Sequence, residues 1–412
     1  MVTGVQTCAL PILNARPAPI FARPRLIIDV SHIAQNDHET GIPRVVKETV
    51  RAAYCSDRPS FDALAVERIG DRLVPATGWL ARQQLLLPHE LPAREQQTIS
   101  FRAGDHLLML DSSWAAIDSF MPVFAAASAA RVPIVTAIYD LLPITLPPGN
   151  FVDGGKEWFE SWLRKAIAAS DGLVCISRSV ADDVIKFITD HKLGRPGLKV
   201  GWWRLGSTLP DKSEPPPHSL VRSAAMAPYA LMVGTIEPRK NHELALDAFE
   251  RMWADGSDLH LVIAGKPGWL VDKLLLRLRS HPQRKKKLFF FEQSTDAEIA
   301  HLYRNAALLL FLSKGEGFGL PLVEAAHYGT PIVCSDIPSF REIAGQHATY
   351  VAIDTVSILS AEIIKWNNAA AASDIPRSVD MPRQTWKQST ESLLDVVVGE
   401  QWCWRCSGVV ST

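Results

Sequence analysis

From residue 313 to residue 325 the sequence runs Ser313-Lys314-Gly315-Glu316-Gly317-Phe318-Gly319-Leu320-Pro321-Leu322-Val323-Glu324-Ala325. The apolar run before it, residues 306–312, is typical of a buried parallel strand, and residues 320–328 have the spacing of a helix. Pro321 fits an early helical position, and Gly329 is placed to end the helix. The stretch therefore predicts a strand, a glycine-rich loop and a helix.

Two carboxylates lie eight positions apart in this stretch, Glu316 on the loop and Glu324 in or just after the first helical turn. Gly317 and Gly319 lack a Cβ, so the backbone can approach a ligand closely there. The free N–H groups of the helix start favour an anion. We expect a site for an anion that carries hydroxyl groups, such as a sugar nucleotide. The alternative is a solvated loop glutamate and a second glutamate favoured by the helix dipole.

The string Glu-Gly-Phe-Gly-Leu-Pro-Leu-Val-Glu-Ala resembles the Glu-x7-Glu signature of the retaining glycosyltransferases of family 4, which have the GT-B fold. This resemblance implies an α/β protein with two Rossmann-like parallel-sheet domains facing a central cleft. It also implies that Glu316 contacts the donor sugar and Glu324 the nucleotide ribose. The other donor-binding positions implied on this loop are Gly317, Phe318, Gly319 and Leu320.

A second motif follows the strand-like run of residues 229–236, which includes Gly234. Its loop reads Glu237-Pro238-Arg239-Lys240-Asn241 and leads into an apolar-faced helix. In the family the Arg and Lys of this segment bind the donor diphosphate, which implies the same role for Arg239 and Lys240. Cations that strengthen their hold on a departing diphosphate would suit the chemistry. Taken alone, such a pair is usually solvated.

Strand and helix patterns continue to alternate through both halves of the chain, which indicates parallel sheets covered on both faces. Ligands of such sheets bind outside the carboxyl ends of the strands, where Gly234, Gly265 and Gly315 all fall. In the first half, residues 29–31 and 40–46 resemble a bacterial branch that includes mannosyltransferases of O-antigen assembly. That narrower resemblance implies that Gly41 and Arg44 lie on the acceptor side. The alternative for residues 40–44 is a helix-start loop.

Tyr139-Asp140 stands at the end of a central strand of the first half, where many relatives have His-Asp. The change removes an imidazole that could donate a hydrogen bond to the donor sugar, so no catalytic role is carried over to Tyr139. Asp140 is carried over as a catalytic and acceptor-side residue. The alternative is an Asp that caps the next turn. Glu316, Asp140, Arg239 and Lys240 are the catalytic residues that we predict.

The length suits two domains. We expect an acceptor-binding domain over residues 21–210, a proline-rich linker without helix or strand over residues 211–228, and a donor-binding domain over residues 229–384. By the resemblance, a helix over residues 385–400 crosses back onto the first domain. Residues 1–20 we expect to be outside the fold, because residues 1–12 look like a translated adapter. The tail, residues 401–412, looks like a remnant.

A net charge of −1 gives no broad positive field, so nucleic acid is not expected as a partner. Residues 284–287 form a basic run, which we interpret as a solvated turn, with a membrane-contact patch as the alternative. Scattered His residues indicate no metal site, and no cofactor is expected. Cys403 and Cys406 could pair or bind metal, but they have no partner motif. The remaining cysteines favour a reduced, cytoplasmic protein, with peripheral association at the inner membrane face left open.

The sequence therefore predicts a glycosyltransferase that moves a hexose from a nucleotide sugar to a bacterial surface glycan or lipid-linked acceptor. Mannose, GDP-mannose as the donor and retention of configuration follow from the resemblance alone. A sugar-nucleotide epimerase of the same fold is an alternative. A second alternative is a sugar-nucleotide-binding scaffold without turnover, which the Tyr139 change suggests.

Overall fold

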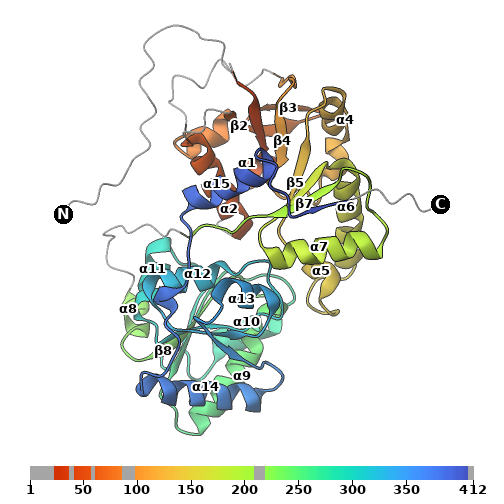
Figure 1. Ribbon diagram of the computed structural model, residues 1–412. Coiled ribbons are helices and arrows are strands. Elements are labelled where there is room, and N and C mark those ends of the chain that lie inside the picture. Colours follow the sequence, from red (N-terminus) through yellow and green to blue (C-terminus); the bar gives the residue numbers. More distant parts are fainter. Residues whose placement is uncertain (1–22, 37–40, 57–60, 86–97, 208–218, 407–412) are drawn as a thin grey trace.

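The computed structural model describes residues 23–36, 41–56, 61–85, 98–207 and 219–406. These residues form two units, one above the other in Figure 1, and each is built on one β-sheet with helices around it. The first sheet draws its strands from the first half of the chain and from the C-terminal segment. The second sheet lies wholly in the second half. The limits predicted for the domains stay predictions.

The first sheet has the strand order β14-β7-β6-β5-β4-β1-β2-β3. Its six inner strands are parallel, whereas β3 and β14 run antiparallel at the two edges. The strands are β1 (Arg25–Asp29), β2 (Asp62–Ile69), β3 (Arg72–Pro75), β4 (His106–Met109), β5 (Ile134–Ile138), β6 (Gly172–Cys175), β7 (Lys199–Trp202) and β14 (Trp404–Arg405). The helices are α1 (Ser31–Gln35), α2 (Gly41–Tyr54), α3 (Thr77–Arg82), η2 (Ile117–Phe120), α4 (Met121–Ala129), α5 (Leu142–Thr145), α6 (Gly155–Ala169) and α7 (Arg178–Asp190).

The second sheet is parallel throughout, in the order β10-β9-β8-β11-β12-β13. Its strands are β8 (Tyr229–Val233), β9 (His260–Ala264), β10 (Leu288–Phe291), β11 (Leu308–Phe311), β12 (Ile332–Ser335) and β13 (Thr349–Val351). Its helices are α8 (Ser219–Ala224), η3 (Pro238–Lys240), α9 (His242–Ala254), α10 (Asp272–Ser280), α11 (Asp296–Asn305), α12 (Leu320–Tyr328), α13 (Pro338–Ala344), α14 (Val356–Ala371) and η4 (Ser378–Asp380). The strand order reverses between β8 and β11, which is where ligands bind in open parallel sheets.

Helix α12 begins and ends at the residues that the sequence predicts, Leu320 and Tyr328. Pro321 lies in its first turn, and both flanking glycines, Gly319 and Gly329, adopt left-handed conformations. Such a conformation is strained for a residue with a Cβ, so glycine defines both helix ends. The strand before it, β11, is buried along its whole length, as its continuous apolar run indicates.

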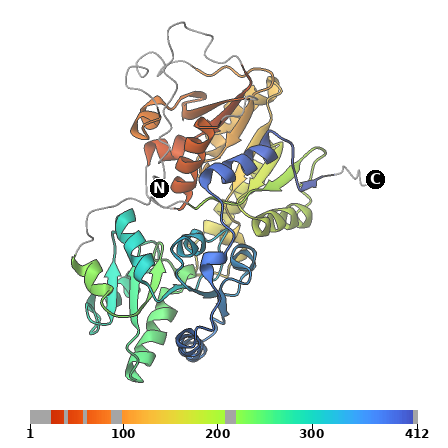
Figure 2. The same ribbon diagram turned by 60° about the vertical axis from the view of Figure 1, so that its left-hand side comes forward.

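The C-terminal helix α15 (Trp386–Val397) leaves the second unit and packs on α2, β6 and β7 of the first, as both Figure 1 and Figure 2 show. Thr385 caps its start, and the helix buries Leu393 and Leu394. A Cβ at Gly206 would lie 2.6 Å from the Cα of Trp386, so only glycine allows the helix start to approach this closely. The chain therefore connects the two units twice.

The segment that follows α15, interpreted from sequence as a remnant, adds a strand to the first sheet. Strand β14 pairs antiparallel with β7. A Cβ on Gly172 would lie 2.4 Å from the Trp402 ring, and a Cβ on Gly201 would lie 3.1 Å from it. Cys403 and Cys406 are free thiols, and so are Cys175 and Cys334. Cys55, however, is disulfide-bonded, which the expectation of fully reduced cysteines did not foresee.

The expected linker contains a helix, which corrects the sequence interpretation of residues 219–224. Helix α8 occupies these residues because the prolines that break helices, Pro215–Pro217 and Pro228, lie on either side of it. The proline-rich part of the linker lies outside the described residues, as do residues 1–22.

Trp402→Ala should lower the free energy of unfolding by about 2 kcal/mol, because it empties the space between the last strand and the sheet. Trp158, which is 47% exposed on α6, provides the control, and Trp158→Ala should change stability by less than about 0.5 kcal/mol. Urea unfolding of both variants measures the difference. Equal midpoints for the two variants would show that the terminal strand does not stabilise the sheet.

Candidate functional site

Two loops meet where the second sheet reverses its strand order. One loop follows β8 and includes η3, and the other follows β11 and precedes α12. The backbone N–H of Lys314 donates to the carbonyl of Arg239 at 2.8 Å, and the Arg239 guanidinium donates to the carbonyl of Gly315 at 2.9 Å. The two sequence motifs, 76 residues apart, therefore form one surface at the carboxyl ends of the strands.

Glu316 is the centre of a charged cluster on this surface. Its Oε1 accepts from Arg239 at 2.8 Å, from the Ser313 hydroxyl at 2.7 Å and from the Lys240 ammonium. Burial alone would raise the pKa of this carboxyl, but Arg239, Lys240 and the hydrogen bonds outweigh burial and lower the pKa to about 2. Glu316 is therefore ionised at neutral pH, and it neutralises two cations that are at most 14% exposed.

Glu237 is a member of this cluster that the sequence interpretation missed. It is 3% exposed, and its carboxylate accepts from the second guanidinium nitrogen of Arg239 at 2.6 Å. Arg239 is thus held from two sides, by Glu237 and by Glu316. The sequence signal that could have identified Glu237 is its position after a buried strand, just before Pro238 and two residues before Arg239.

Asp140 faces the same cluster from the first unit. Burial raises the pKa of its carboxyl, while Arg239 and Lys240 act in the opposite direction. Its Oδ1 also accepts from the backbone N–H of Leu142 at 3.0 Å, as the capping alternative expected. Burial lowers the pKa of Lys240, and Glu316 offsets this only in part. With Glu237, the cluster holds three carboxylates for two cations. Its carboxylate oxygens can therefore still accept a hydrogen bond from a ligand hydroxyl.

Glu324 joins the two units at a second point. Its Oε1 accepts from the Arg44 guanidinium of α2 at 2.5 Å, and its Oε2 accepts from the Tyr303 hydroxyl at 2.8 Å. The carboxylate is buried, so both contacts are shielded from water. Arg44, predicted for the acceptor side, therefore reaches the predicted ribose ligand across the cleft. The sequence placed these two side chains in different domains and gave no signal for their contact.

The glycines of the 313–325 loop bring the two units together. A Cβ on Gly317 would lie 1.9 Å from the carbonyl oxygen of Tyr139, and a Cβ on Gly315 would lie 2.7 Å from the Leu142 side chain. The Ser177 hydroxyl also donates to the Gly317 carbonyl at 2.6 Å. Sequence reasoning expected a close approach of a ligand here. In the structure the first unit makes that approach.

Several predicted residues lie away from the charged cluster. Phe318 is 2% exposed and packs in the hydrophobic core, and Leu320 packs against that core. The Tyr139 hydroxyl donates to the Leu110 carbonyl at 2.7 Å, so the side chain lies within the first unit. Gly41 is exposed at the start of α2, where an added Cβ would meet none of the described residues within 4 Å. Gly234 lies at the base of the site, where its carbonyl leaves no room for a Cβ on Gly265.

The rims of the cleft are also bridged. The Glu342 carboxylate accepts from the backbone N–H groups of Arg178 and Ser179 at the start of α7, at 2.9 and 2.7 Å. On another rim, the Trp269 indole donates to the Asn150 carbonyl at 3.0 Å. A carboxylate at a helix N-terminus is stabilised by the dipole. The structure is therefore a closed form of the two units.

Within the described ranges, no three His, Cys, Asp or Glu side chains are grouped so that they could hold a metal ion. Over the same residues, no helix is both long enough and apolar enough to cross a bilayer.

Comparison with known proteins shows which family model and which relatives the chain resembles. The family model for Glycosyl transferases group 1 matches residues 221–370, which contain both loops of the site. The serotype-specific mannosyltransferase WbdA of Escherichia coli is 35% identical over 382 residues, which cover 90% of this chain and 44% of WbdA. The O-antigen chain mannosyltransferase RfbU of Salmonella typhimurium is 30% identical over 255 residues, 59% of this chain and 66% of RfbU. The chain thus spans about half the length of WbdA.

Among solved structures, Anabaena Alr3699/HepE in complex with UDP superimposes with a TM-score of 0.56 at 15% identity, covering 91% of this chain and 95% of that one. At this identity the likeness shows the fold alone, which is GT-B. The sequence expectation of two Rossmann-like units facing each other is confirmed, except that the first sheet has antiparallel edges. Residues 221–370, which form most of the second unit, match the group 1 glycosyltransferase family.

A further pair of carboxylates lies at the carboxyl ends of β1 and β4, where the first sheet reverses its strand order. Asp29 is 1% exposed, and burial together with the neighbouring Asp111 raises its pKa to about 7. Its Oδ1 accepts from the backbone N–H of Ser31 at 3.2 Å. Asp111 accepts from the backbone N–H groups of Ile33 and Ser112 at 2.7 Å each. Asp29 is therefore a buried hydrogen-bond acceptor at a strand end.

Asp29→Asn should become steadily more stable relative to the wild type as pH rises from about 4 to 7. The folded state holds the Asp29 proton up to about pH 7, whereas the unfolded chain loses it near 3.8, so the wild type loses stability over this range. Above pH 8 the difference should be constant. Urea unfolding at several pH values measures it, with exposed Asp153→Asn as the control. A pH-independent difference would contradict the raised pKa.

Gly317→Ala should open the cleft, because the added Cβ cannot remain 1.9 Å from the Tyr139 carbonyl. The amides of Arg178 and Ser179, which bond to Glu342 in the closed form, should exchange with deuterium about ten times faster. Gly78→Ala is the control, since a Cβ there meets nothing closer than 3.8 Å. Unchanged protection in Gly317→Ala would show that this contact does not hold the units together.

Proposed function

We propose that this chain transfers mannose from GDP-mannose to a growing bacterial surface glycan, with retention of the anomeric configuration. One observation carries the proposal: Arg239 and Lys240 converge on Glu316 at the switch point of the second sheet. The names of the mannosyltransferase relatives supply the sugar and the class of acceptor. The nucleotide and the stereochemistry rest on the family resemblance.

Arg239 and Lys240 provide the positive charge that a departing nucleoside diphosphate needs. Glu316 and Glu237 hold them in place, so they would not have to reorganise when the diphosphate arrives. Glu316 has a second role, since an ionised carboxylate accepts hydrogen bonds from sugar hydroxyls and can orient the mannose. No cofactor takes part in the proposed reaction.

Glu324 would bind the ribose hydroxyls through the carboxylate that Tyr303 and Arg44 orient. The acceptor hydroxyl would attack the anomeric carbon on the face from which the diphosphate leaves, and a departing phosphate oxygen would take its proton. Asp140 lies on the first unit and faces the sugar end of the site, where it would position the acceptor. We place the reaction in the cytoplasm, with a lipid-linked acceptor and peripheral membrane contact as parts of the proposal.

The identity of the donor is tested by supplying GDP-mannose, UDP-glucose, UDP-GlcNAc and dTDP-rhamnose with membrane-extracted or synthetic mannosyl acceptors. We expect release of GDP only, with an α-linked product from the α-linked donor by NMR. Consumption of a UDP- or dTDP-sugar in place of GDP-mannose would overturn the donor assignment. Donor binding without turnover on any acceptor would favour the scaffold alternative.

Arg239→Ala and Lys240→Ala should each lower turnover by ~10²–10³, the scale of losing one donor that stabilises the transition state. Glu316→Gln should also lower turnover while leaving GDP affinity within about threefold. Lys286→Ala, an exposed lysine of the basic run, is the control and should turn over like the wild type. Activity should survive excess chelator. Loss of activity in chelator, restored by Mg²⁺ or Mn²⁺, would show that a metal supplies the charge.

A further inference from the structure

A pocket of about 690 Å³ lies beside the charged cluster, between the start of α9 and the loop that leads from β9 to α10. This volume is within the range of small-ligand sites. Glu237 lines it, and Glu237 also holds Arg239, so the pocket and the proposed diphosphate site share a wall. Lys314 lines it as well, and its ammonium lies 3.4 Å from the Asn150 amide oxygen of the first unit. The pocket therefore reaches the boundary between the two units.

The polar groups that line this pocket do not provide all of one another's hydrogen-bond partners. His242 lines it and is 2% exposed, yet its Nδ1 has no hydrogen-bond partner among the residues that the structure describes. Burial and Lys240 lower the pKa of this imidazole to about 3, so the ring is neutral. The Asn241 side chain does not cap α9, because it donates to the Leu312 carbonyl instead. The first-turn N–H groups of α9 thus have no side-chain cap.

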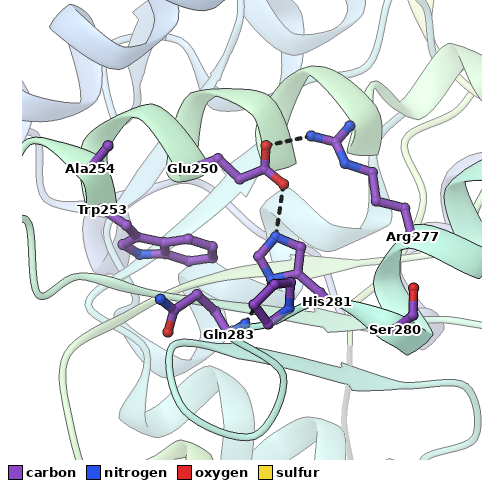
Figure 3. A pocket seen from close by; sticks show the side chains of 8 residues that line it. Glu250, Trp253, Ala254, Arg277, Ser280, His281 and Gln283 are labelled. Carbon is purple, nitrogen blue, oxygen red and sulfur yellow. Dashed lines mark hydrogen bonds and ion pairs between the residues drawn. The ribbon is translucent and has the colours of Figure 1, made fainter.

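The pocket in Figure 3 gives the contrast. It measures about 520 Å³ and lies at the other end of α9. There Glu250 accepts from Arg277 at 2.6 Å and from the His281 Nε2 at 2.7 Å, and the His281 Nδ1 accepts from the backbone N–H of Gln283 at 3.0 Å. Both ring nitrogens of His281 therefore have hydrogen-bond partners within the protein, and the imidazole needs none from a ligand. His242 differs because its Nδ1 lacks such a partner among the described residues, and a ligand would supply one.

The charges around the His242 pocket restrict the ligand. Two of its four lining carboxylates are paired with arginines outside the lining, Glu237 with Arg239 and Asp247 with Arg277. The carboxylates of Glu243 and Asp272 and the ammonium groups of Lys273 and Lys314 also line the pocket. An anion would meet the carboxylates, and a cation would meet the lysines. A neutral ligand with many hydroxyl groups can donate to Glu243 and Asp272 and accept from the lysines, the imidazole and the helix start. Among the reactants proposed above, only the glycan acceptor has this chemistry, because the donor carries a diphosphate.

An aromatic pair lies next to this pocket, at the boundary between the two units. Trp269 immediately precedes the pocket-lining Leu270, and its ring stacks on Phe151 of the first unit at 5.8 Å between centroids. Apolar faces of sugars pack on such rings. We propose that the pocket at the start of α9 is an accessory subsite that binds a distal part of the glycan acceptor while its end is extended in the cleft. This inference rests on the proposed function.

The test uses the full chain, GDP-mannose and α-linked mannose oligosaccharides of two and of six residues. A variant with Glu243→Gln and Asp272→Asn keeps the size of both side chains and removes their charge. We expect its KM for the hexasaccharide to rise about fivefold or more, with kcat, the KM for GDP-mannose and the KM for the disaccharide unchanged. Asp255→Asn, at the far end of α9, is the matched control and should behave as the wild type.

Calorimetric titration of the hexasaccharide into the wild type and the variant gives a second readout that does not need turnover. Weaker binding to the variant alone supports the subsite. Equal affinities, or an equal rise in KM for both oligosaccharides, would overturn it, and so would a raised KM for GDP-mannose, which would assign the pocket to the donor. Absence of any mannosyl transfer with intact hexasaccharide binding would refute the proposed function and leave the glycan pocket standing.

Discussion

The rest of the structure depends on two cations that lie out of bulk water, Arg239 and Lys240. An unpaired buried charge is strongly destabilising, so each must have an anion nearby. Glu316 serves both, and Glu237 completes the shell of Arg239. Meeting this requirement brings loops after β8 and β11 together, which only a reversal of strand order between them allows. The fold and the charge cluster therefore depend on the same neighbour relation between two strands.

The second unit alone does not complete the site. The first unit supplies Asp140 next to the cluster and Arg44 next to Glu324, and it reaches them through contacts at the glycines of the 313–325 loop. Because the approach involves the backbone of Tyr139, it leaves no room for a side chain at Gly317. A closed form of this kind excludes water from the ion pairs and strengthens them. Opening must therefore precede the entry of any ligand as large as a nucleotide sugar.

Much of this architecture could be predicted from the sequence, because it depends on local patterns. Helix α12 was located to the residue, since Pro321 and Gly329 mark its ends and the apolar run before it has the length of a strand. Helix α8 was missed because neighbouring prolines dominated the composition. Strands β2 and β3 were not predicted, since this side of the sheet is defined by strand pairing more than by its own residues.

The candidate site also has parts that could be predicted from the sequence and parts that could not. The two motifs could be found because each is a contiguous string, and their meeting follows from sheet topology. The contact of Arg44 with Glu324 joins residues 280 positions apart and depends on how the two units close, which no local pattern encodes. Gly317 was recognised as a place of close approach, but the partner in that approach is the Tyr139 backbone, and a single sequence does not identify it.

The Trp402 ring lies flat where Gly172 and Gly201, on neighbouring strands, have no side chains, and a Cβ at Gly201 would also meet Val396 of α15 at 2.5 Å. These four positions therefore cannot vary independently. A larger residue on either strand requires a smaller one at position 402, and an enlarged position 396 would press on the same space. In evolutionary terms the sheet, the returning helix and the last strand form one epistatic unit, in which a substitution that is harmful alone becomes neutral in the company of a second. Loss of the tryptophan would release the constraint on Gly172, whereas Val396 would still restrict Gly201.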